Sequence, residues 1–542
     1  MPTTKYIFVT GGVISSLGKG IFAASMGNLL KHHGLPVSIM KLDPYINIDA
    51  GTMSPFQHGE VFVTDDGGET DMDIGHYERF LDCNLSRASN VTAGQIYWSV
   101  LTRERRGDYL GSTVQVIPHV TNQIKSALQL VAKQSDLELI VVEVGGTVGD
   151  IESLPFLEAI RQMAIQVGRE NSMFIHLTLM PYVEASGEVK TKPTQHSVKE
   201  LLSLGIQPDM IVCRTGRPLS KETREKIAMF CNVPAEFVIE GRTRKYLYEV
   251  PLALQKENLP ELVARRLGLT LGQPKGPNEF EELAERLKNP REGAVTIGII
   301  GKYVRQHDAY ISIHEAVTHG GIACDVKTEI QYVSSEDVDG QLDLSAFDGV
   351  IVPGGFGERG IEGKIEAIRR IRTSGVPFLG ICLGMQCAVI EYARNVCKLD
   401  RANSTEFDPQ SEHPVIDLLA DQRQLEQKGG TMRLGLYPGK LVADSLARAV
   451  YGSELIYERH RHRYEFNTRF RPLIEEAGMR ISATSPDERY VEMVEVPAHP
   501  WFVGVQFHPE LLSRPMRPHP LFRAFVDACK KGRGSRPKGA GR

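Results

Sequence analysis

Short runs of continuously apolar residues recur through the first half of the chain, separated by stretches with helical periodicity. They are YIFVT (6–10), VSIMKLD (37–43), LELIVVEVGG (137–146), MFIHLTLM (173–180) and MIVCR (210–214). A strand that is apolar at every position, rather than at alternate ones, is typical of a parallel sheet with helices on both faces. Stretches such as IFAASMGNLLKHHG (21–34) supply the crossover helices. The pattern predicts a doubly wound α/β domain over residues 1–268.

A second series of apolar runs follows a change in composition near residue 268. Residues 269–293 hold glycines and prolines around one short charged helix, which is typical of an interdomain linker. The second series comprises VTIGIIGKY (295–303), FDGVIVPGGFG (347–357), PFLGICLGMQ (377–386) and FVGVQFHPE (502–510). It predicts a second doubly wound, mainly parallel α/β domain over residues 294–529. Residues 530–542 are basic and lack large apolar side chains, so we expect a frayed, disordered tail.

The composition excludes several classes of protein. The formal net charge of −4 argues against a protein that mainly binds nucleic acid nonspecifically. Eight scattered cysteines form no C-x-x-C pair, so we expect no disulfide framework, no zinc site and a reducing, cytoplasmic location. The chain has no signal-like start and no apolar run near the ~20 residues that span a bilayer. We therefore expect a soluble protein with no membrane partner.

The stretch GICLGMQ (380–386) places Cys382 between Gly380 and Gly384, after an apolar strand and before an apolar helix. This is G-x-C-x-G, the thiol form of a nucleophile elbow, in which a cramped turn leaves room only for glycine on either side. The N-terminus of the following helix favours the thiolate. Taken alone, the motif leaves open a small buried cysteine in a glycine-rich turn.

Two further stretches supply the groups that a cysteine nucleophile needs. In QFHPE (506–510), His508 and Glu510 end an apolar strand as a base and its orienting carboxylate. In PGGFG (353–357), the backbone N–H groups suit an oxyanion. The order of the three stretches resembles that of the class I glutamine amidotransferases.

That resemblance implies that Cys382 attacks the side-chain amide of glutamine, with His508 as acid and base and Glu510 orienting the imidazole. The backbone N–H groups of Gly355 and Leu383 would bind the oxyanion. Ammonia would leave as the product, and the first half of the chain should then supply its acceptor.

The stretch TGGVISSLGKG (10–20) follows the first apolar strand and precedes a helix, as a phosphate-binding loop does. It fails the pattern G-x-x-x-x-G-K-[ST], because Gly12 and Gly18 are one residue too far apart and Gly20 replaces the usual hydroxyl ligand of magnesium. Its N–H groups can still form an anion-binding nest. Lys19 can reach a phosphoryl group in transfer. A plain glycine-rich turn is the alternative.

Carboxylates that can replace the missing hydroxyl lie further along the chain. Glu143 ends a buried strand, where a magnesium-binding carboxylate is commonly placed, and a polar loop over 65–78 offers Asp71, Asp73 and Glu78. A charge-rich solvated loop without a ligand is the alternative.

Two basic segments indicate a second anionic substrate. GEVKTKPTQHS (187–197) carries Lys190 and Lys192, and RERRGDYLG (103–111) clusters three arginines. Either segment could be solvated surface, but both accompany the phosphate loop. Residue types therefore lead to ATP-dependent amination of an anionic acceptor.

Longer segments closely resemble the CTP synthase family, from about residue 4 to about residue 525. In the first half they are GGVISSLGKG (11–20), KLDPYIN…HYERF (41–80), VQVIPH (114–119), GGTVGDIESLPFLEAIRQ (145–162) and GEVKTKPTQHSVKELLSLGIQPD (187–209). In the second half they are ANSTEF (402–407), GGTMRLG (429–435) and ERHRHRYEFN (458–467). The resemblance implies a ligase of pyrimidine nucleotide biosynthesis. ATP would phosphorylate the 4-oxygen of UTP, and ammonia from glutamine would displace this phosphate to give CTP.

The same resemblance assigns the site residues. ATP would contact Ser16, Leu17, Gly18, Lys19, Gly20, Ile21 and Asp73, with Arg242, Thr243 and Arg244 beside the adenine. UTP, or CTP in its place, would contact Ser15, Asp150, Ile151, Glu152, Lys190, Thr191, Lys192, Pro193, Thr194, Gln195 and Lys226. Glutamine would contact Gly355, Leu383, Gly384, Met385, Gln386, Glu406 and Arg463. Lys19 would act near the transferring phosphate, Asp73 and Glu143 would bind Mg²⁺, and no organic prosthetic group is expected.

The resemblance also implies effectors and an assembly. GTP would activate glutamine hydrolysis, CTP would inhibit by feedback, and four chains would form a homotetramer with UTP sites near the subunit interfaces. Phe56 and His58 would line a channel for ammonia. One departure is the acidic Glu358 in GGFGERG, where some relatives are expected to carry aromatic or other residues.

Two other functions remain on residue types alone. Another amidoligase of the same layout would aminate a carboxylate in cofactor biosynthesis, since fold does not fix the substrate. A regulatory or scaffold protein would keep the nucleotide-binding halves without catalysis. The long KLDPYIN…HYERF and KTKPTQH segments favour UTP as the acceptor. The joint presence of Lys19, Cys382, His508 and Glu510 argues against a scaffold.

Overall fold

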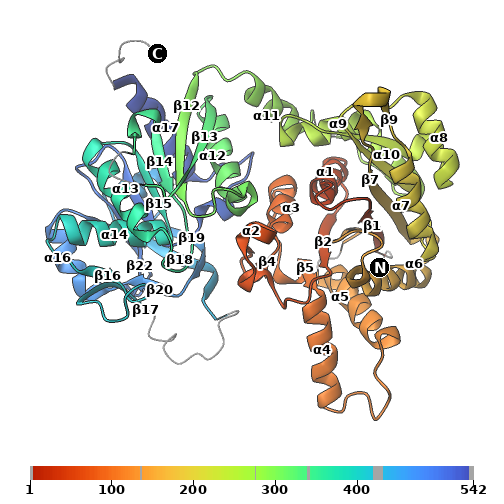
Figure 1. Cartoon of the computed structure of the whole chain (residues 1–542), viewed down its shortest axis with the longest axis horizontal. Coiled ribbons are helices and arrows are strands. Elements are labelled where there is room, and N and C mark those ends of the chain that lie inside the picture. Colours follow the sequence, from red (N-terminus) through yellow and green to blue (C-terminus); the bar gives the residue numbers. More distant parts are fainter. Residues whose placement is uncertain (1–3, 135–136, 275, 339–341, 419–430, 536–542) are drawn as a thin grey trace. The chain divides into compact units, whose positions relative to one another are not determined.

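The computed structural model describes residues 4–134, 137–274, 276–338, 342–418 and 431–535. Contacts between residues divide the chain into two compact units. The first unit comprises Met1–Ala50 and Asp73–Glu285, and the second comprises Gly51–Met72 and Arg286–Arg542. Figure 1 labels many of the helices and strands of both units.

A seven-stranded sheet forms the centre of the first unit, in the order β11-β10-β7-β1-β6-β2-β5, and every pair of neighbours is parallel. The strands are β1 (Lys5–Gly11), β2 (Val37–Asp43), β5 (Asn90–Thr92), β6 (Leu139–Val144), β7 (Ser172–Leu179), β10 (Met210–Thr215) and β11 (Val238–Arg242). The predicted apolar runs form β1, β2, β6, β7 and β10, so that prediction is confirmed. Because the strands are parallel, the loops that follow them meet at one edge of the sheet.

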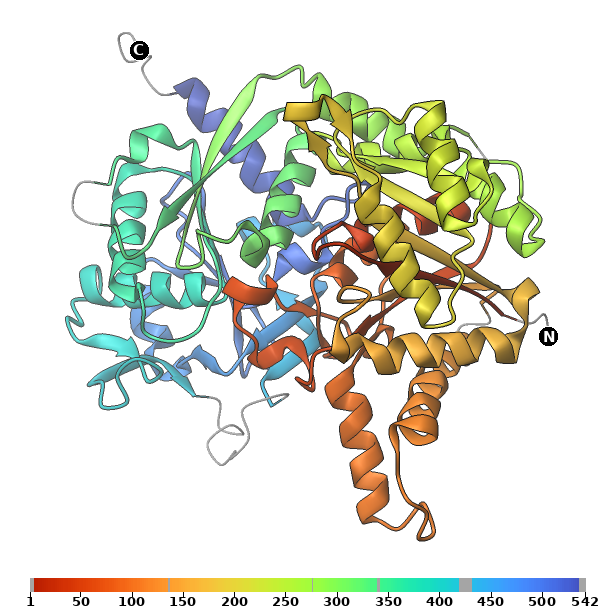
Figure 2. The ribbon, with the colours of Figure 1, turned by 45° about the vertical axis from the view of Figure 1, so that its right-hand side comes forward.

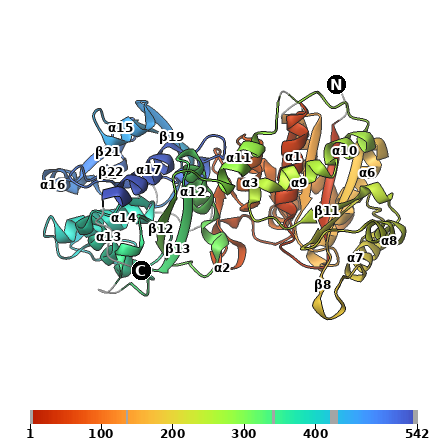
Figure 3. The ribbon, with the colours of Figure 1, turned by 90° about the horizontal axis from the view of Figure 1, so that it is seen from above.

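Helices cover both faces of this sheet. Tyr6 and Phe8 of β1 pack in one buried cluster with residues of α5 and α6, whereas the intervening Ile7 and Val9 are equally buried on the other side. On that side α1 packs against β2 and β6, and it lies beside α9 (Figure 3). The helices are α1 (Lys19–His32), α3 (Asp73–Leu81), α4 (Ala93–Arg105), α5 (Thr121–Gln134), α6 (Leu154–Val167), α7 (Lys192–Ser203), α8 (Lys221–Cys231), α9 (Val250–Lys256) and α10 (Leu259–Leu267).

Two features of the first unit extend beyond the sheet. α4 and the chain that leads from it to α5 project away from the strands (Figure 2). A small hairpin, β8 (Tyr182–Val183) with β9 (Glu188–Val189), precedes α7.

The second unit contains a nine-stranded sheet in the order β13-β12-β14-β15-β23-β22-β21-β18-β19. The first five strands are mutually parallel, and the other four continue the sheet antiparallel. They are β12 (Ala294–Gly301), β13 (Lys327–Ser334), β14 (Gly349–Val352), β15 (Phe378–Ile381), β18 (Arg433–Leu441), β19 (Leu455–His462), β21 (Arg480–Thr484), β22 (Val491–Glu495) and β23 (Phe502–Val505). The predicted apolar runs of the second half are β12, β14, β15 and β23, which confirms the mainly parallel α/β class.

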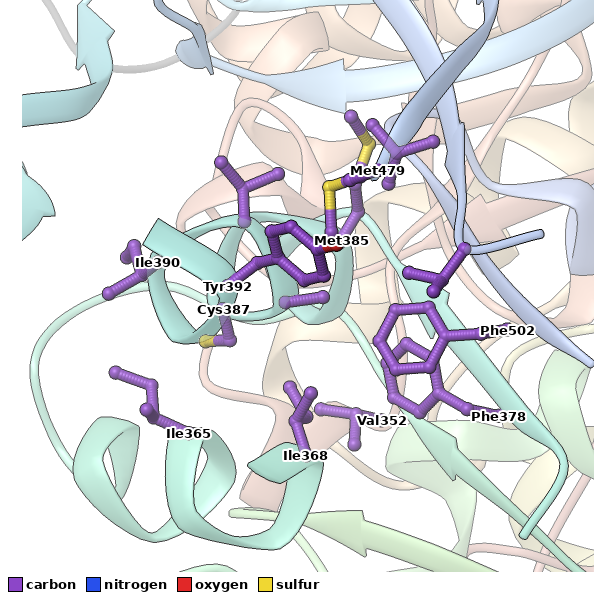
Figure 4. Close-up of a cluster of buried hydrophobic side chains, with 14 of the residues drawn as sticks. Val352, Ile365, Ile368, Phe378, Met385, Cys387, Ile390, Tyr392, Met479 and Phe502 are labelled. Carbon is purple, nitrogen blue, oxygen red and sulfur yellow. The ribbon is translucent and has the colours of Figure 1, made fainter. Parts of the chain in front are cut away.

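Two pairs of helices enclose the parallel part of this sheet. α12 (Ile311–Ala323) packs with α17 (Pro520–Ser535), and α13 (Ile361–Ser374) packs with α14 (Leu383–Asn395). Beneath α13 and α14, Phe378 and Phe502 lie with ring centroids 4.4 Å apart, and Met385 and Ile368 join the same buried cluster (Figure 4). This core anchors the first turn of α14, which follows Cys382. The remaining elements are α15 (Leu446–Tyr451), α16 (Arg471–Glu476) and a small sheet of β16 (Ala402–Ser404), β17 (His413–Leu418) and β20 (Tyr464–Phe466).

Gly51–Met72 belongs to the second unit although the first unit flanks it in sequence. It contains α2 (Pro55–His58) and an antiparallel pair, β3 (Phe62–Val63) and β4 (Glu69–Thr70). We call residues 62–70 the inserted hairpin. Sequence analysis did not predict that this segment lies among residues of the second half.

Three local expectations compare with the structure as follows. The expected linker contains its predicted helix, α11 (Glu279–Lys288). The prediction of a loop over 65–78 is wrong beyond residue 72, because Asp73 begins α3. α17 continues to Ser535, so the first residues of the expected tail are helical, while 536–542 lie outside the described residues, as do 429 and 430 of GGTMRLG. Within the described ranges, no helix has the length and apolar character required to cross a membrane.

The aromatic contact below α14 gives a test of the fold. Phe378→Ala removes a fully buried ring beside Phe502, and we expect a loss of about 3–5 kcal/mol in the free energy of unfolding. Tyr457→Ala, at a side chain that is 55% exposed, is the control. Urea denaturation followed by circular dichroism measures both. Equal effects of the two substitutions would contradict the assigned core.

Candidate active site

Cys382 lies at the sharp turn between β15 and α14, with φ 52° and ψ −105°. A positive φ in a residue with a side chain marks backbone strain. A Cβ on Gly380 would lie 2.9 Å from the backbone of Gly384, and one on Gly384 would lie 1.9 Å from the carbonyl oxygen of Val352. The turn therefore admits only glycine at both positions, as the G-x-C-x-G spacing predicts.

His508 and Glu510 follow β23 and lie beside the thiol. The His508 Nδ1 and Glu510 Oε1 atoms are 2.8 Å apart, and the two side chains are only 14% and 7% exposed. Burial opposes the charged imidazolium, but the negative charges of Glu510 and Cys382 outweigh it and raise the pKa of His508 to about 10. Cys382 contributes to this rise by its charge and by a hydrogen bond to the imidazole, whose Nδ1 is occupied by Glu510.

The PGGFG loop forms one wall of the pocket that contains these residues. A Cβ on Gly354 would lie 3.1 Å from His508 Cε1 and 3.6 Å from Cys382 Cβ, so the loop passes directly beside both. Gly355 and Phe356 also line this pocket. The backbone of the loop therefore faces the thiol, where an oxyanion would form.

Two buried lysines hold the PGGFG loop. Lys364 of α13 is fully buried, its Nζ donates to the Pro353 carbonyl at 2.9 Å, and burial lowers its pKa to about 8. Lys302 donates to the carbonyls of Phe356 and, at 3.2 Å, Gly357. Sequence analysis missed both lysines. The signal for Lys364 was a cation within the apolar stripe of α13.

Gln386 is linked to the thiol through a second glutamine. Its Nε2 donates to Gln506 Oε1 at 3.3 Å, and Gln506 Nε2 lies 3.7 Å from Cys382 Sγ. The side chains of Leu383 and Met385 are buried in the core. These two residues therefore offer only their backbone groups to a ligand.

The other predicted glutamine contacts lie farther along the site. Glu406 Oε1 accepts from the Gly357 N–H at 2.7 Å, and burial raises the pKa of this carboxyl. Arg463 is not among the pocket-lining residues, and its Nη1 donates to Thr431 Oγ1 at 2.8 Å. Glu358 is exposed at the end of the PGGFG loop.

In the first unit, the loop between β1 and α1 turns through positive-φ residues that include Ser16 and Gly18. Ser15 and Ser16 are exposed, Leu17 is buried, and the space beside the Gly18 Cα is open. A Cβ on Gly20 would lie 2.1 Å from Asp73 Oδ1. The carboxylate of Asp73 thus occupies the place where the usual phosphate loop carries a hydroxyl.

A cluster of buried charges surrounds this loop. Lys19 Nζ donates to the Gly146 carbonyl at 2.8 Å. Burial lowers the pKa of Lys19, although the negative charge of Glu143 acts to raise it. Lys41 forms a hydrogen-bonded ion pair with Asp73. Lys41 was not predicted, although a lysine at the end of a continuously apolar strand was a usable signal.

Asp73 and Glu143 suit a hard cation. Burial raises the pKa of Glu143, and the negative charge of Asp73 raises it further. The positive charge of Lys41 acts in the opposite direction. Tyr77 donates a hydrogen bond to Glu143. Magnesium is commonly held by one or two carboxylates together with substrate phosphates. No group of three or more His, Cys, Asp or Glu side chains in the described part of the chain could hold a metal, so the two carboxylates fit only together with phosphate oxygens.

Of the three carboxylates predicted within 65–78, only Asp73 lies against the phosphate loop. Glu78 is fully buried in α3 and accepts from the Leu85 N–H at 2.8 Å. Asp71 belongs to the second unit. The arginines of 103–106 lie at the end of α4, where Arg103 and Arg106 pair with Asp108.

The loop assigned to UTP lies beside the phosphate loop. The Val148 N–H donates to the Gly11 carbonyl at 2.8 Å. The same loop carries Asp150, Ile151 and Glu152, and Ile151 is 81% exposed.

Residues at the start of α7 are held within the fold. Thr194 Oγ1 lies 2.9 Å from Thr178 Oγ1, and Gln195 Nε2 donates to Thr191 Oγ1 at 3.1 Å. All four side chains are buried, and Pro193 occupies the first turn of the helix. The start of α7 is therefore held by these hydrogen bonds beside the exposed Lys192.

Lysines near α7 form a basic surface. Lys190 pairs with Glu188 and lowers its pKa, and the charge of Lys226 contributes to the same shift. Lys192 Nζ lies 5.8 Å from the centroid of the Phe230 ring. The charges of Lys190 and Lys226 therefore both act on Glu188.

Arg242 ends β11, and Thr243 and Arg244 follow it. β10 and β7 separate β11 from β1. Arg242 Nε donates to Glu240 Oε1 at 2.7 Å, and the Thr243 N–H donates to the Thr215 carbonyl at 3.1 Å. These contacts place the three residues at the same sheet edge as the phosphate loop but do not join them to it.

Comparison with known proteins adds two family matches. The family described as "CTP synthase N-terminus" matches residues 5–269. The family described as "Glutamine amidotransferase class-I" matches residues 306–528.

Curated relatives named CTP synthase match nearly the whole chain. The relative from Caldanaerobacter subterraneus subsp. tengcongensis is 61% identical over 527 residues, which are 97% of this chain and 98% of the relative. That from Clostridium acetobutylicum is 61% identical over 530 residues, 97% of this chain and 99% of the relative. Among solved structures, the Trypanosoma brucei CTPS glutaminase domain with bound acivicin is 39% identical, covers 44% of this chain and 94% of that chain, and has a TM-score of 0.41.

The raised pKa of His508 predicts a pH-dependent stability. The folded protein binds a proton at His508 that the unfolded chain releases above its ordinary pKa of about 6.5. The stabilisation is therefore complete below about pH 6.5, and it is lost as the pH rises through about 10. Glu510→Gln removes the main opposite charge, so we expect the gap in melting temperature between the wild type and this variant to shrink from pH 6.5 to 10.

Thermal denaturation across this pH range measures the gap. Glu391→Gln is the matched control, because its carboxylate is fully buried and accepts two hydrogen bonds from Arg372 rather than from a histidine. Its gap to the wild type should stay level. A constant gap for Glu510→Gln would contradict the assigned ion pair.

Proposed function

This chain belongs to the CTP synthase family, and we propose that its two units carry out the two halves of one reaction. It is a glutamine-hydrolysing ligase that converts UTP to CTP. The observation that carries the finer proposal is the His508–Glu510 pair, 2.8 Å across, beside a thiol on a strained turn. That arrangement suits release of ammonia from an amide.

In the proposed first half, the Cys382 sulfur attacks the side-chain carbonyl carbon of glutamine. His508, oriented by Glu510, holds the proton of the thiol–imidazole pair while the sulfur attacks, and then donates it to the leaving nitrogen, so that ammonia departs. The N–H groups of Gly355 and Leu383 stabilise the oxyanion. Water, activated by His508, then hydrolyses the thioester and releases glutamate.

Substrate glutamine would be held at both ends of its backbone. Arg463 suits the α-carboxylate and Glu406 the α-ammonium group. The backbone of Gly384, Met385 and Gln386, at the start of α14, completes the proposed contacts.

In the proposed second half, ATP phosphorylates the 4-oxygen of UTP. A uracil carbonyl oxygen is a poor leaving group, and phosphorylation makes it a good one. Ammonia then attacks the 4-carbon, the phosphate leaves, and CTP forms. The N–H groups of Ser16–Ile21 and the Lys19 ammonium would hold the phosphates of ATP. Asp73 and Glu143 would hold Mg²⁺, which neutralises phosphate charge when bound.

The remaining nucleotide contacts are proposed on the same basis. Ser15 and the loop Asp150–Glu152 would contact UTP, together with Lys190–Gln195 and Lys226. Their lysines suit a triphosphate, which UTP and CTP share, and a shared site accounts for feedback inhibition by CTP. Arg242–Arg244 would lie beside the adenine of ATP.

We also propose a homotetramer. Trp98 and Leu101 of α4 are 64% and 55% exposed, and Leu110 beyond it is 93% exposed. Exposed apolar side chains gathered in this way are typical of a protein interface. Ile151, in the loop assigned to UTP, is 81% exposed, which supports a UTP site near such an interface.

Activation by GTP and an ammonia channel belong to the same proposal. Activation by GTP rests on membership of the family. Phe56 and His58 remain the proposed channel residues, and their neighbours Pro55 and Val61 line the pocket of Cys382.

Two substitutions test the division of labour. Cys382→Ala should reduce glutamine-dependent CTP synthesis by more than about 1,000-fold, because no nucleophile remains, and should leave synthesis from ammonium chloride intact. Lys19→Ala should reduce both activities by about 100-fold or more, because phosphate charge loses its partner. Absorbance of CTP formed from UTP and ATP measures each. A folded Cys382→Ala variant that had also lost the ammonium reaction would overturn the separation of the two halves.

Gly20→Ser would restore the hydroxyl of the usual phosphate loop, yet its Cβ would lie 2.1 Å from Asp73 Oδ1. We expect ammonium-dependent synthesis to fall at least about tenfold through this displacement, with glutamine hydrolysis unchanged. Gly216→Ser, where no atom lies within 4 Å of the added Cβ, is the control in the same unit. Full activity of Gly20→Ser would show that Asp73 does not replace the hydroxyl.

A further inference from the structure

The inserted hairpin packs closely against strand β18 of its own unit. A Cβ on Gly435 would lie 2.6 Å from the Asp65 carbonyl and 2.8 Å from the Gly67 nitrogen, so two backbones meet here without side chains between them. The Leu436 N–H donates to the Asp65 carbonyl at 2.9 Å. Phe62 is fully buried. The hairpin is therefore docked at a defined position.

Asp65 of the hairpin holds a buried arginine that contacts the catalytic turn. Arg459 is fully buried, and its Nε donates to Asp65 Oδ1 at 2.7 Å. Its Nη1 donates to the Leu511 carbonyl at 3.4 Å, and its own carbonyl accepts from the His508 N–H at 2.8 Å. Arg459 therefore touches the turn on both sides of Glu510.

Glu69 of the hairpin holds a second arginine, beside the thiol. Arg461 Nε donates to Glu69 Oε1 at 2.9 Å, and the Glu69 side chain is 1% exposed. The Arg461 guanidinium lies 5.0 Å from the centroid of the Phe356 ring in the PGGFG loop. The Arg461 carbonyl lies 3.9 Å from Cys382 Sγ.

The two arginines are two residues apart on β19, so their side chains point to the same face of that strand. On this face each guanidinium meets a carboxylate of the hairpin. The strand backbone at the same residues meets His508 and Cys382. Arg459 and Arg461 therefore each link an ion pair of the hairpin to a catalytic residue.

We propose that the inserted hairpin is a positioning element for glutamine hydrolysis. Asp65, through Arg459, holds the turn 508–511, and Glu69, through Arg461, holds the PGGFG loop. The two carboxylates act through other residues, so they are positioning residues. This inference rests on the proposed function of the Cys382 pocket.

The physical reason is the cost of a buried donor without its acceptor. Without Asp65, the Arg459 Nε–H loses its acceptor, and a buried donor that loses its acceptor favours a shift of the guanidinium. Such a shift moves Leu511 and with it the His508–Glu510 pair. A displacement near 1 Å at reacting groups can cost about 100-fold in rate.

Asp65→Ala and Glu69→Ala test the inference in the full-length protein. Steady-state release of glutamate from glutamine gives kcat and KM. We expect kcat to fall about 10- to 100-fold, with KM changed by less than about threefold, because the carboxylates do not hold glutamine. Synthesis from ammonium chloride should stay within about twofold of the wild type, since the phosphate loop is untouched. Asp65→Asn keeps an acceptor oxygen and should lie between the wild type and Asp65→Ala.

The control is Glu391→Ala, which breaks a buried arginine pair in the same unit. Glu391 is fully buried and accepts two hydrogen bonds from Arg372 at 2.8 Å each. It should lower the melting temperature and leave kcat unchanged. If the hairpin variants also lost melting temperature but kept kcat within twofold of the wild type, the inference would be overturned. An equal loss of kcat in Glu391→Ala would overturn it as well.

Cys382→Ala in the same assay separates this inference from the proposed function. If Cys382→Ala still released glutamate, the assigned pocket would fail, whatever the hairpin variants did. If it were inactive while Asp65→Ala and Glu69→Ala were fully active, only the positioning role would fail. Where an alanine variant does not fold, Asp65→Asn and Glu69→Gln take its place, and a full kcat in both would overturn the inference.

Discussion

The carboxylate of Asp73 lies so close to the Gly20 backbone that no side chain fits between them. This contact fixes the first turn of α1, and so the point from which Lys19 reaches the Gly146 carbonyl. Asp73 is also the residue at which the chain returns to the first unit after Gly51–Met72. One continuous stretch therefore carries the inserted hairpin and then a carboxylate of the phosphate site.

Charges buried beside opposite charges are the common feature of both sites. Burial lowers the pKa of Lys19 and raises that of Glu143, and each of these two charges opposes the shift of the other. At the thiol, the charges of Glu510 and Cys382 overcome burial and keep His508 protonated to a high pH. Removing one member leaves an uncompensated charge in a region of low polarity. The sites therefore depend on complete sets of charged residues.

The sequence predicted what depends on local pattern. Continuously apolar runs predicted the parallel strands, and glycines around Cys382 predicted a turn that only glycine fits. Pairings between distant residues could not be predicted in this way, because periodicity shows that a residue is buried but not what covers it. Asp65 and Arg459, 394 positions apart, are such a pair. Lys364 was missed for a related reason, since its partner is a backbone carbonyl that has no sequence signature.

Different interactions stabilise the docked hairpin and set its position. β19 is the last strand of its sheet, and an edge strand needs its backbone groups covered. Phe62 and Val63 supply buried apolar surface, which stabilises the contact without fixing its direction. Ion pairs add little net stability once desolvation is counted, but their geometry is specific. Apolar residues therefore keep the hairpin in place, and the pairs with Arg459 and Arg461 set its position relative to the catalytic turn.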